Sequence, residues 1–227
     1  MTNLNQNGRS MIEMLGVLAI IGVLSVGGIA GYSKAMMKFK TNKTIDQIAM
    51  TVTNIRTLYA QQKDYDITTS QAYKMGVTDD AMGTGATLGN AFSGWAEIAP
   101  AKSGVQGETT GAFVVTFGGL PREACVAIAT NDWGSGYSSG LLGIGAGAAS
   151  DKKADTHVVG DIPCDVNGDS VASPTNIKDG EASVTYTALK KYSCAVGKVS
   201  AAFSVADAAA GCACENGNYC YVTFKYY

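Results

Sequence analysis

The sequence predicts an α+β protein in which a long N-terminal helix packs on an antiparallel sheet head with disulfide-stapled loops. Three observations predict it: an early uncharged apolar run that passes into an amphipathic helical pattern, several segments with strand-type alternation, and six cysteines. The chain has 227 residues, a formal net charge of −2 and one histidine. This charge gives no electrostatic footprint for nucleic acid, and one histidine excludes any site that needs two.

The predicted helix covers residues 9–62. Its first half contains the uncharged run Met14–Ile29, and the stretch 10–32 is long enough to span the ~30 Å hydrocarbon core of a bilayer. In the second half, apolar residues recur at alternating spacings of three and four, which is typical of one face of an amphipathic helix. These residues are Ile45, Ile48, Val52, Ile55 and Tyr59. We therefore expect a membrane-spanning half, followed by a half that packs against a globular head, 63–227.

Local patterns predict the elements of the head. Strands are expected at Trp95–Pro100, Phe113–Phe117, Ser183–Leu189, Val199–Val205 and Tyr219–Tyr227. A short helix with Pro121 at its first position is expected to carry Cys125 on its apolar face. Ile67–Ala91 resembles an extended loop with short turns, and the glycine-rich segment Asn131–Gly160 is expected to be irregular, with little core-forming content.

Residues that suggest other chemistry do not combine into a credible active site. Asp165, Asn167 and Asp169 alternate like the first half of a calcium loop, but Ser170 occupies the position of the sharp-turn glycine. A solvated turn beside a disulfide is the stronger interpretation. The glycines of 143–147 lack a following Lys-Ser/Thr, and the two cysteines of 212–214 lack a second ligand pair at zinc spacing. We therefore expect neither enzyme activity nor a cofactor.

The beginning of the chain resembles the cleavage motif of type IV prepilins. Gly8 ends a short polar leader, Glu13 follows five residues later, and the apolar run Met14–Ile29 comes next. Arg9 stands where this family usually has phenylalanine or another apolar residue. The resemblance implies a leader, 1–8, that a prepilin peptidase removes by cutting between Gly8 and Arg9. It also implies that Glu13 pairs during assembly with the new α-amino group of Arg9 on a neighbouring copy, and the Arg9 guanidinium is a second candidate partner.

The head resembles that of class b pilins. Asn90–Trp95 is similar to the turn that begins their sheet, and Gly119–Cys125 is similar to their cysteine-bearing short helix. In that class, the cysteine of the short helix bonds to the cysteine before the final strand. The resemblance therefore implies a type IV pilin fold in which Cys125 pairs with Cys214.

The other four cysteines are less constrained by the pattern. In a tight hairpin at Asn216-Gly217, Cys212 and Cys214 share a face and Cys220 does not, so a Cys212–Cys220 bond needs a bulge or a wider turn. With Cys125–Cys214 taken from the family, we expect the two remaining bonds to join the cysteines left over. These are Cys212–Cys220 and Cys164–Cys194.

Two signals for membrane topology disagree. Four lysines follow the apolar run, and the positive-inside rule would place this end of the span in the cytoplasm. They are Lys34, Lys38, Lys40 and Lys43. Six cysteines instead favour an oxidising compartment, and in prepilins the C-terminal part is translocated despite such lysines. We follow the cysteines and the motif, which imply a single-pass inner-membrane protein that later enters an extracellular pilus.

The resemblance implies a structural subunit of a bacterial type IV pilus that polymerises through its N-terminal helix. The implied partners are copies of itself in a helical fibre, a prepilin peptidase, an inner-membrane assembly platform and, before assembly, the lipid bilayer. Two alternatives stay open. One is a pseudopilin of a type II secretion system, and the other is a signal-anchored extracytoplasmic enzyme or binding protein.

Overall fold

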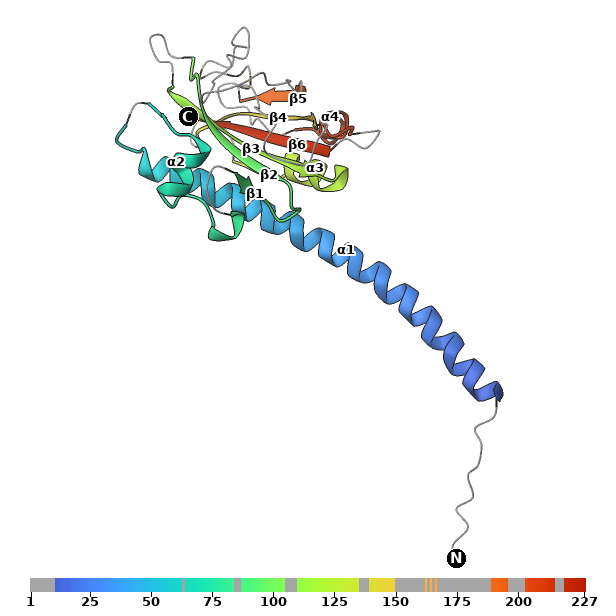
Figure 1. Ribbon diagram of the computed structural model, residues 1–227. Helices are drawn as coiled ribbons and strands as arrows, with labels where there is room; N and C mark the ends of the chain where they lie inside the picture. The colour runs from blue at the N-terminus through green and yellow to red at the C-terminus, as the bar shows by residue number, and fades with distance from the viewer. Residues whose placement is uncertain are drawn as a thin grey trace, which may run out of the picture. The chain divides into compact units, whose positions relative to one another are not determined.

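The computed structural model describes residues 11–62, 64–83, 87–104, 110–134, 139–149, 162, 164, 166, 189–195, 203–214 and 219–227. The chain divides into two compact units, Met1–Phe39 and Lys40–Tyr227. Helix α1, Met11–Leu58, contributes residues to both of them (Figure 1). The predicted helix is therefore present, although it ends at Leu58 rather than at residue 62.

The part of α1 that belongs to the second unit is buried along one face. The buried side chains are Thr41, Thr44, Gln47, Ile48, Thr51, Val52 and Ile55. Ile48, Val52 and Ile55 belong to the predicted stripe, whereas the threonines and Gln47 make this face more polar than the sequence pattern indicates. Thr44 satisfies its hydroxyl within the helix by donating to the Lys40 carbonyl at 2.9 Å. Such local bonds allow threonine to replace aliphatic residues on a buried helical face.

The C-terminal end of α1 is attached to the rest of the second unit by polar and aromatic contacts. Arg56 Nη1 donates to the Ser139 carbonyl at 2.6 Å. The Tyr59 ring lies 5.5 Å from that of Tyr65, which in turn lies 4.8 Å from Phe113 of the sheet. Because aromatic pairs at such spacings add to the energy of burial, they stabilise the packing of this end of the helix on the sheet.

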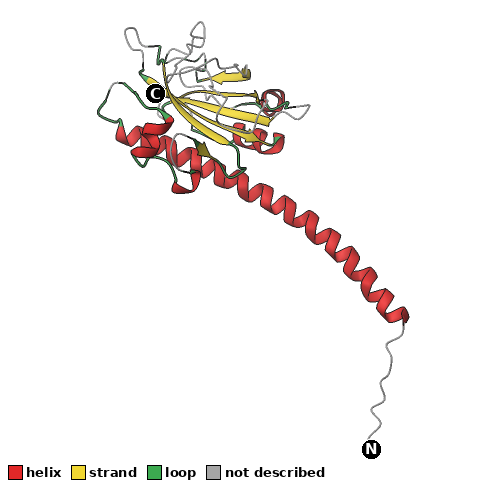
Figure 2. Cartoon of the chain, viewed as in Figure 1, coloured by secondary structure: helices red, strands yellow, loops and turns green. Residues whose placement is uncertain are grey.

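An antiparallel sheet forms the centre of the second unit (Figure 2). Its strands are β1 (Leu88–Gly89), β2 (Trp95–Ala101), β3 (Ala112–Leu120), β4 (Leu141–Ala149), β5 (Leu189–Cys194) and β6 (Tyr219–Tyr226). Within the described residues the strand order is β1-β2-β3-β6-β4-β5, and every neighbouring pair is antiparallel. The strands predicted at 95–100, 113–117 and 219–227 are confirmed. The strand farthest along the chain, β6, lies in the interior of the sheet.

Both faces of the sheet are buried along β6. On one face, aromatic and aliphatic residues of β3 and β6 stand opposite each other as Phe113–Tyr226, Val115–Phe224 and Phe117–Val222. On the other face Tyr221, Thr223 and Lys225 are also fully buried. Lys225 Nζ donates to the Ile162 carbonyl at 3.1 Å. Burial raises the pKa of the Tyr221 and Tyr226 phenols well above their ordinary value of 10.0.

Strand β4 contradicts the prediction that Asn131–Gly160 is irregular. It lies between β6 and β5, and each of its residues is buried. A Cβ added at Gly145 would lie 2.6 Å from Leu189 Cδ2, and one at Gly147 would lie 2.5 Å from Tyr221 Oη. Side chains of the neighbouring strands thus occupy the space above the glycines. A segment with few large side chains forms a core strand because other parts of the chain supply them.

The segment before the sheet also holds more structure than an extended loop. Within Ile67–Ala91, the structure has helix α2 (Thr69–Lys74), the short 3₁₀ helix η1 (Asp80–Met82) and strand β1. Thr68 begins α2 with a capping box: its hydroxyl accepts from the Gln71 backbone N–H, and the Gln71 side chain accepts from the Thr68 N–H. Such a cap stabilises a helix too short for periodicity to reveal it.

Two further short helices flank the sheet. Helix α3, Arg122–Ala129, begins after Pro121, which is its N-cap rather than its first residue. Helix α4, Val205–Gly211, corrects the strand predicted at Val199–Val205; residues 199–202 lie outside the described residues. Ser204 caps α4 by accepting from the Asp207 N–H at 3.1 Å. The strand predicted at 183–189 reaches the described residues only at Leu189, where β5 begins.

Candidate assembly site

The first unit is a regular helix that buries none of its described side chains. From Met11 to Phe39 every residue is exposed or half-exposed, and the apolar side chains of the run retain large accessible fractions, such as 76% for Val23. An 18-residue window of α1 is apolar enough to cross a membrane by composition and length. A helix without a polar face is stable only in lipid or against other apolar helices.

Glu13 is the acidic residue in the first turn of α1, and its side chain is exposed in the isolated subunit. It precedes the uncharged run directly, so any environment that covers the run also reaches this carboxylate. Gly8 and Arg9, the predicted cleavage position and cation partner, lie outside the described residues.

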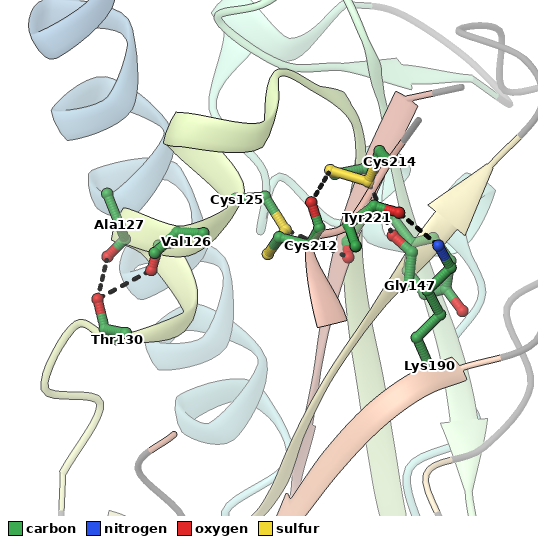
Figure 3. Close-up of a disulfide and its surroundings, with 11 residues drawn as sticks. Cys125, Val126, Ala127, Thr130, Gly147, Lys190, Cys212, Cys214 and Tyr221 are labelled. Carbon is green, nitrogen blue, oxygen red and sulfur yellow. Dashed lines mark hydrogen bonds between the residues drawn. A yellow bond between two sulfur atoms is a disulfide. The ribbon is translucent and has the colours of Figure 1, made fainter. Parts of the chain in front are cut away.

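Three disulfides join the six cysteines of the head. Figure 3 shows the surroundings of the Cys125–Cys212 bond. They are Cys125–Cys212, Cys164–Cys194 and Cys214–Cys220. The predicted Cys164–Cys194 bond is present. The predicted Cys125–Cys214 and Cys212–Cys220 bonds are wrong, because the partners of Cys125 and Cys220 are exchanged.

Helix α4, which the sequence did not reveal, brings Cys212 to Cys125. Cys212 is the C-cap of α4 and is fully buried, and α4 packs against α3, which carries Cys125. The Cys212–Cys220 bond is expected only because these cysteines are left over once Cys125–Cys214 is taken from the family, and it fails together with that pair. Cys214 lies beyond the helix end, where its Sγ approaches the Gly147 carbonyl at 3.7 Å. It closes a short loop to Cys220, the second residue of β6.

The turn at Asn90–Trp95 is organised by one side chain. Asn90 Oδ1 accepts from the N–H groups of Phe92 and Gly94 at 2.9 and 3.1 Å, while Nδ2 donates to the carbonyls of Trp95 and Gly118. All four hydrogen-bonding positions of the amide are thus used, which only asparagine can provide here. Ser93 adopts a left-handed φ of 58° in this turn.

The structure describes no site for the calcium and phosphate-loop candidates of the sequence. Asp165, Asn167 and Asp169, the weak calcium candidates, lie outside the described residues. Among the residues that the structure does describe, no group of three acidic, histidine or cysteine residues is placed to hold a metal ion. The segment 143–147, considered as a phosphate loop, lies within β4.

Comparison with protein families decides the class of the molecule. A family model described as PilS N terminal matches residues 38–189, which is more than half of the chain. The chain belongs to the PilS family. It is a type IV pilin, a structural subunit of a pilus, and the match favours neither the secretion pseudopilin nor the signal-anchored enzyme. A comparison with curated proteins gave no match.

Two solved structures are similar to this PilS-family chain. One is a type IV b pilin from Salmonella typhi, with 18% identity and a TM-score of 0.44 over 82% of this chain and 98% of that chain. The other is TcpA, a type IV pilin from Vibrio cholerae El Tor biotype, with 14% identity and a TM-score of 0.45 over 83% of this chain and 99% of that chain.

Proposed function

We propose that this pilin is made as an inner-membrane precursor and enters the fibre through its N-terminal helix. In this proposal a prepilin peptidase cuts between Gly8 and Arg9, the span 10–32 holds the subunit in the bilayer, and an assembly platform transfers it to a growing fibre of identical copies. The observation that carries the proposal is the helix Met11–Phe39, of which no described residue is buried.

The energy available from this helix is large. Twelve bulky apolar side chains between Met11 and Ile29 are exposed. Burying such side chains contributes about 1.5–3 kcal/mol each, so covering them stabilises the subunit by on the order of 20 kcal/mol. Lipid provides this cover before assembly, and helices of neighbouring copies provide it in a fibre.

Glu13 makes the transfer of the helix from lipid to the fibre depend on a cation partner. Near the lipid boundary its carboxylate reaches water, whereas among apolar helices it needs a cation. We assign this role to the Arg9 α-amino group of a neighbouring copy, with the Arg9 guanidinium as a second candidate. Removing one partner of a buried ion pair typically costs about 3–5 kcal/mol.

The test compares Glu13→Ala with Asp46→Asn, a control that alters an exposed carboxylate on the same helix beyond the apolar run. We expect the Glu13 variant to remain folded and membrane-inserted but to produce no fibres in negative-stain microscopy, while the control produces them normally. Fibres of normal length and number from the Glu13 variant would refute the mechanism. Intact mass of the membrane-extracted protein tests cleavage, since a chain that begins at Met1 excludes it.

A further inference from the structure

Four exposed residues form a collar on α1 directly after the apolar run: Tyr32, Lys34, Lys38 and Phe39. The aromatic side chains are 66% and 64% accessible. Within the described residues neither lysine forms an ion pair. No acidic residue occurs between Met14 and Ile45. The collar thus combines uncompensated positive charge with aromatic side chains that nothing in this unit covers.

The four collar residues do not share one narrow stripe, but spread over about 160° of the helix circumference. At 3.6 residues per turn, Lys34 and Lys38 lie within about 40° of each other, and Tyr32 and Phe39 lie about 130° away from them around the axis. A bilayer contacts both pairs, because it encloses the helix from all directions.

The position of the collar along the helix also fits a bilayer. From Met11 to Tyr32 the helix rises about 32 Å, close to the ~30 Å of a hydrocarbon core. The collar itself extends over about 10 Å, a length that matches the headgroup layer once lysine side chains reach outward. Tyrosine is one of the residues enriched at this depth, and lysine is attracted to anionic headgroups.

We propose that the collar docks on anionic phospholipid headgroups at the bilayer face on the C-terminal side of the span, and so holds the waiting subunit at a fixed depth. The proposal rests on the membrane-anchored stage of the proposed function. The proposal assigns a role to Lys34 and Lys38, which oppose the positive-inside rule. They bind the headgroups of the leaflet on which they emerge. Since a fibre lacks this lipid, the collar stabilises the membrane-inserted subunit relative to the subunit in the fibre.

The experiment uses the full chain in detergent with an equimolar mixture of phosphatidylglycerol and phosphatidylcholine, and counts bound lipids by native mass spectrometry. We expect a preference for phosphatidylglycerol of about 10-fold or more for two lysines near the headgroups. Lys34→Gln/Lys38→Gln should abolish it, and Lys34→Arg/Lys38→Arg should retain it. Lys74→Gln/Lys102→Gln, which removes the same charge from the head, should leave it unchanged.

A parallel measurement separates this inference from the proposed function. Flotation of the chain with 7:3 phosphatidylcholine–phosphatidylglycerol vesicles after a carbonate wash tests insertion alone. Failure to insert would overturn the membrane-anchored stage and the collar with it. Insertion without a phosphatidylglycerol preference, or a preference that survives Lys34→Gln/Lys38→Gln, would overturn the collar and leave the anchored stage intact. Loss of fibres from that variant with its lipid preference intact would assign the lysines to a protein partner instead.

Discussion

Replacing both Cys125 and Cys212 by alanine removes the covalent link between α3 and α4, and we expect it to destabilise the head more than loss of either other disulfide. The two cysteines are 87 residues apart, against 30 for Cys164–Cys194 and 6 for Cys214–Cys220. In the chain-entropy model these loops correspond to about 4–5, about 3–4 and about 2–3 kcal/mol. Full burial of both sulfurs in the first bond adds a packing loss.

The assay is guanidinium unfolding of the full chain in non-ionic detergent, followed by tryptophan fluorescence. Trp95 is 2% exposed and packs near Tyr221, so its emission reports on the sheet core. The three double-alanine variants should unfold in the order Cys125/Cys212, Cys164/Cys194, Cys214/Cys220 as denaturant rises. A Cys214/Cys220 variant that loses as much free energy of unfolding as the Cys125/Cys212 variant would refute the reasoning.

Single substitutions test the connectivity itself. Cys212, Cys214 and Cys220 have no lysine or arginine between them, so a tryptic peptide map cannot tell which one bonds to Cys125. Cys214→Ser should leave a free thiol at Cys220, whereas the pairing inferred from the family would leave it at Cys125. Thiol labelling followed by mass spectrometry distinguishes the two outcomes.

Three further predictions concern packing and pH. Gly147→Ala should lower the free energy of unfolding by about 2–3 kcal/mol because its methyl group meets Tyr221, whereas Gly89→Ala, whose nearest neighbour would be 3.4 Å away, should change it by less than about 1 kcal/mol; equal effects would contradict the clash. Thr51→Val should raise stability by about 1 kcal/mol, because the buried hydroxyl has no hydrogen-bond partner among the described residues; a loss in the same unfolding assay would show that the hydroxyl is bonded. Burial raises the folded-state pKa of Tyr221 and Tyr226, so the unfolded chain releases these protons first and stability is complete below about pH 10. Above that pH it should fall by up to ~1.4 kcal/mol per pH unit for each phenol, and unfolding curves that do not change between about pH 10 and 11 would refute this.

The elements that the sequence predicts well are those whose own side chains carry the pattern. The apolar run and the stripe of Ile48, Val52 and Ile55 predict α1, and alternation predicts β2, β3 and β6. The Asn90 turn is predicted from its resemblance to the turn of class b pilins, and the Asn90 side-chain amide forms four of its hydrogen bonds. For the helix and these strands, the periodicity of their own side chains is sufficient.

The elements that the sequence misses depend on residues far along the chain. Gly145 and Gly147 have no side chains of their own to make a pattern, yet Leu189 and Tyr221 cover them and make β4 a core strand. Helix α4 is one short segment rich in alanine, and its Ser204 cap is a weak signal. The pairing implied by the family resemblance joins Cys125 to Cys214, whereas α4 places Cys212, its C-cap, against Cys125.

The sequence by itself therefore determined the class of this protein, since a membrane-length apolar run, Gly8, Glu13 and six cysteines are local features that need no partner to be recognised. Only the tertiary structure decided the interior of the head: which glycines lie under aromatic rings, which polar side chains of α1 face the core, and which cysteines meet. The physical reason is that burial and disulfide geometry depend on distances between segments far apart in the chain, and residue spacing does not encode those distances.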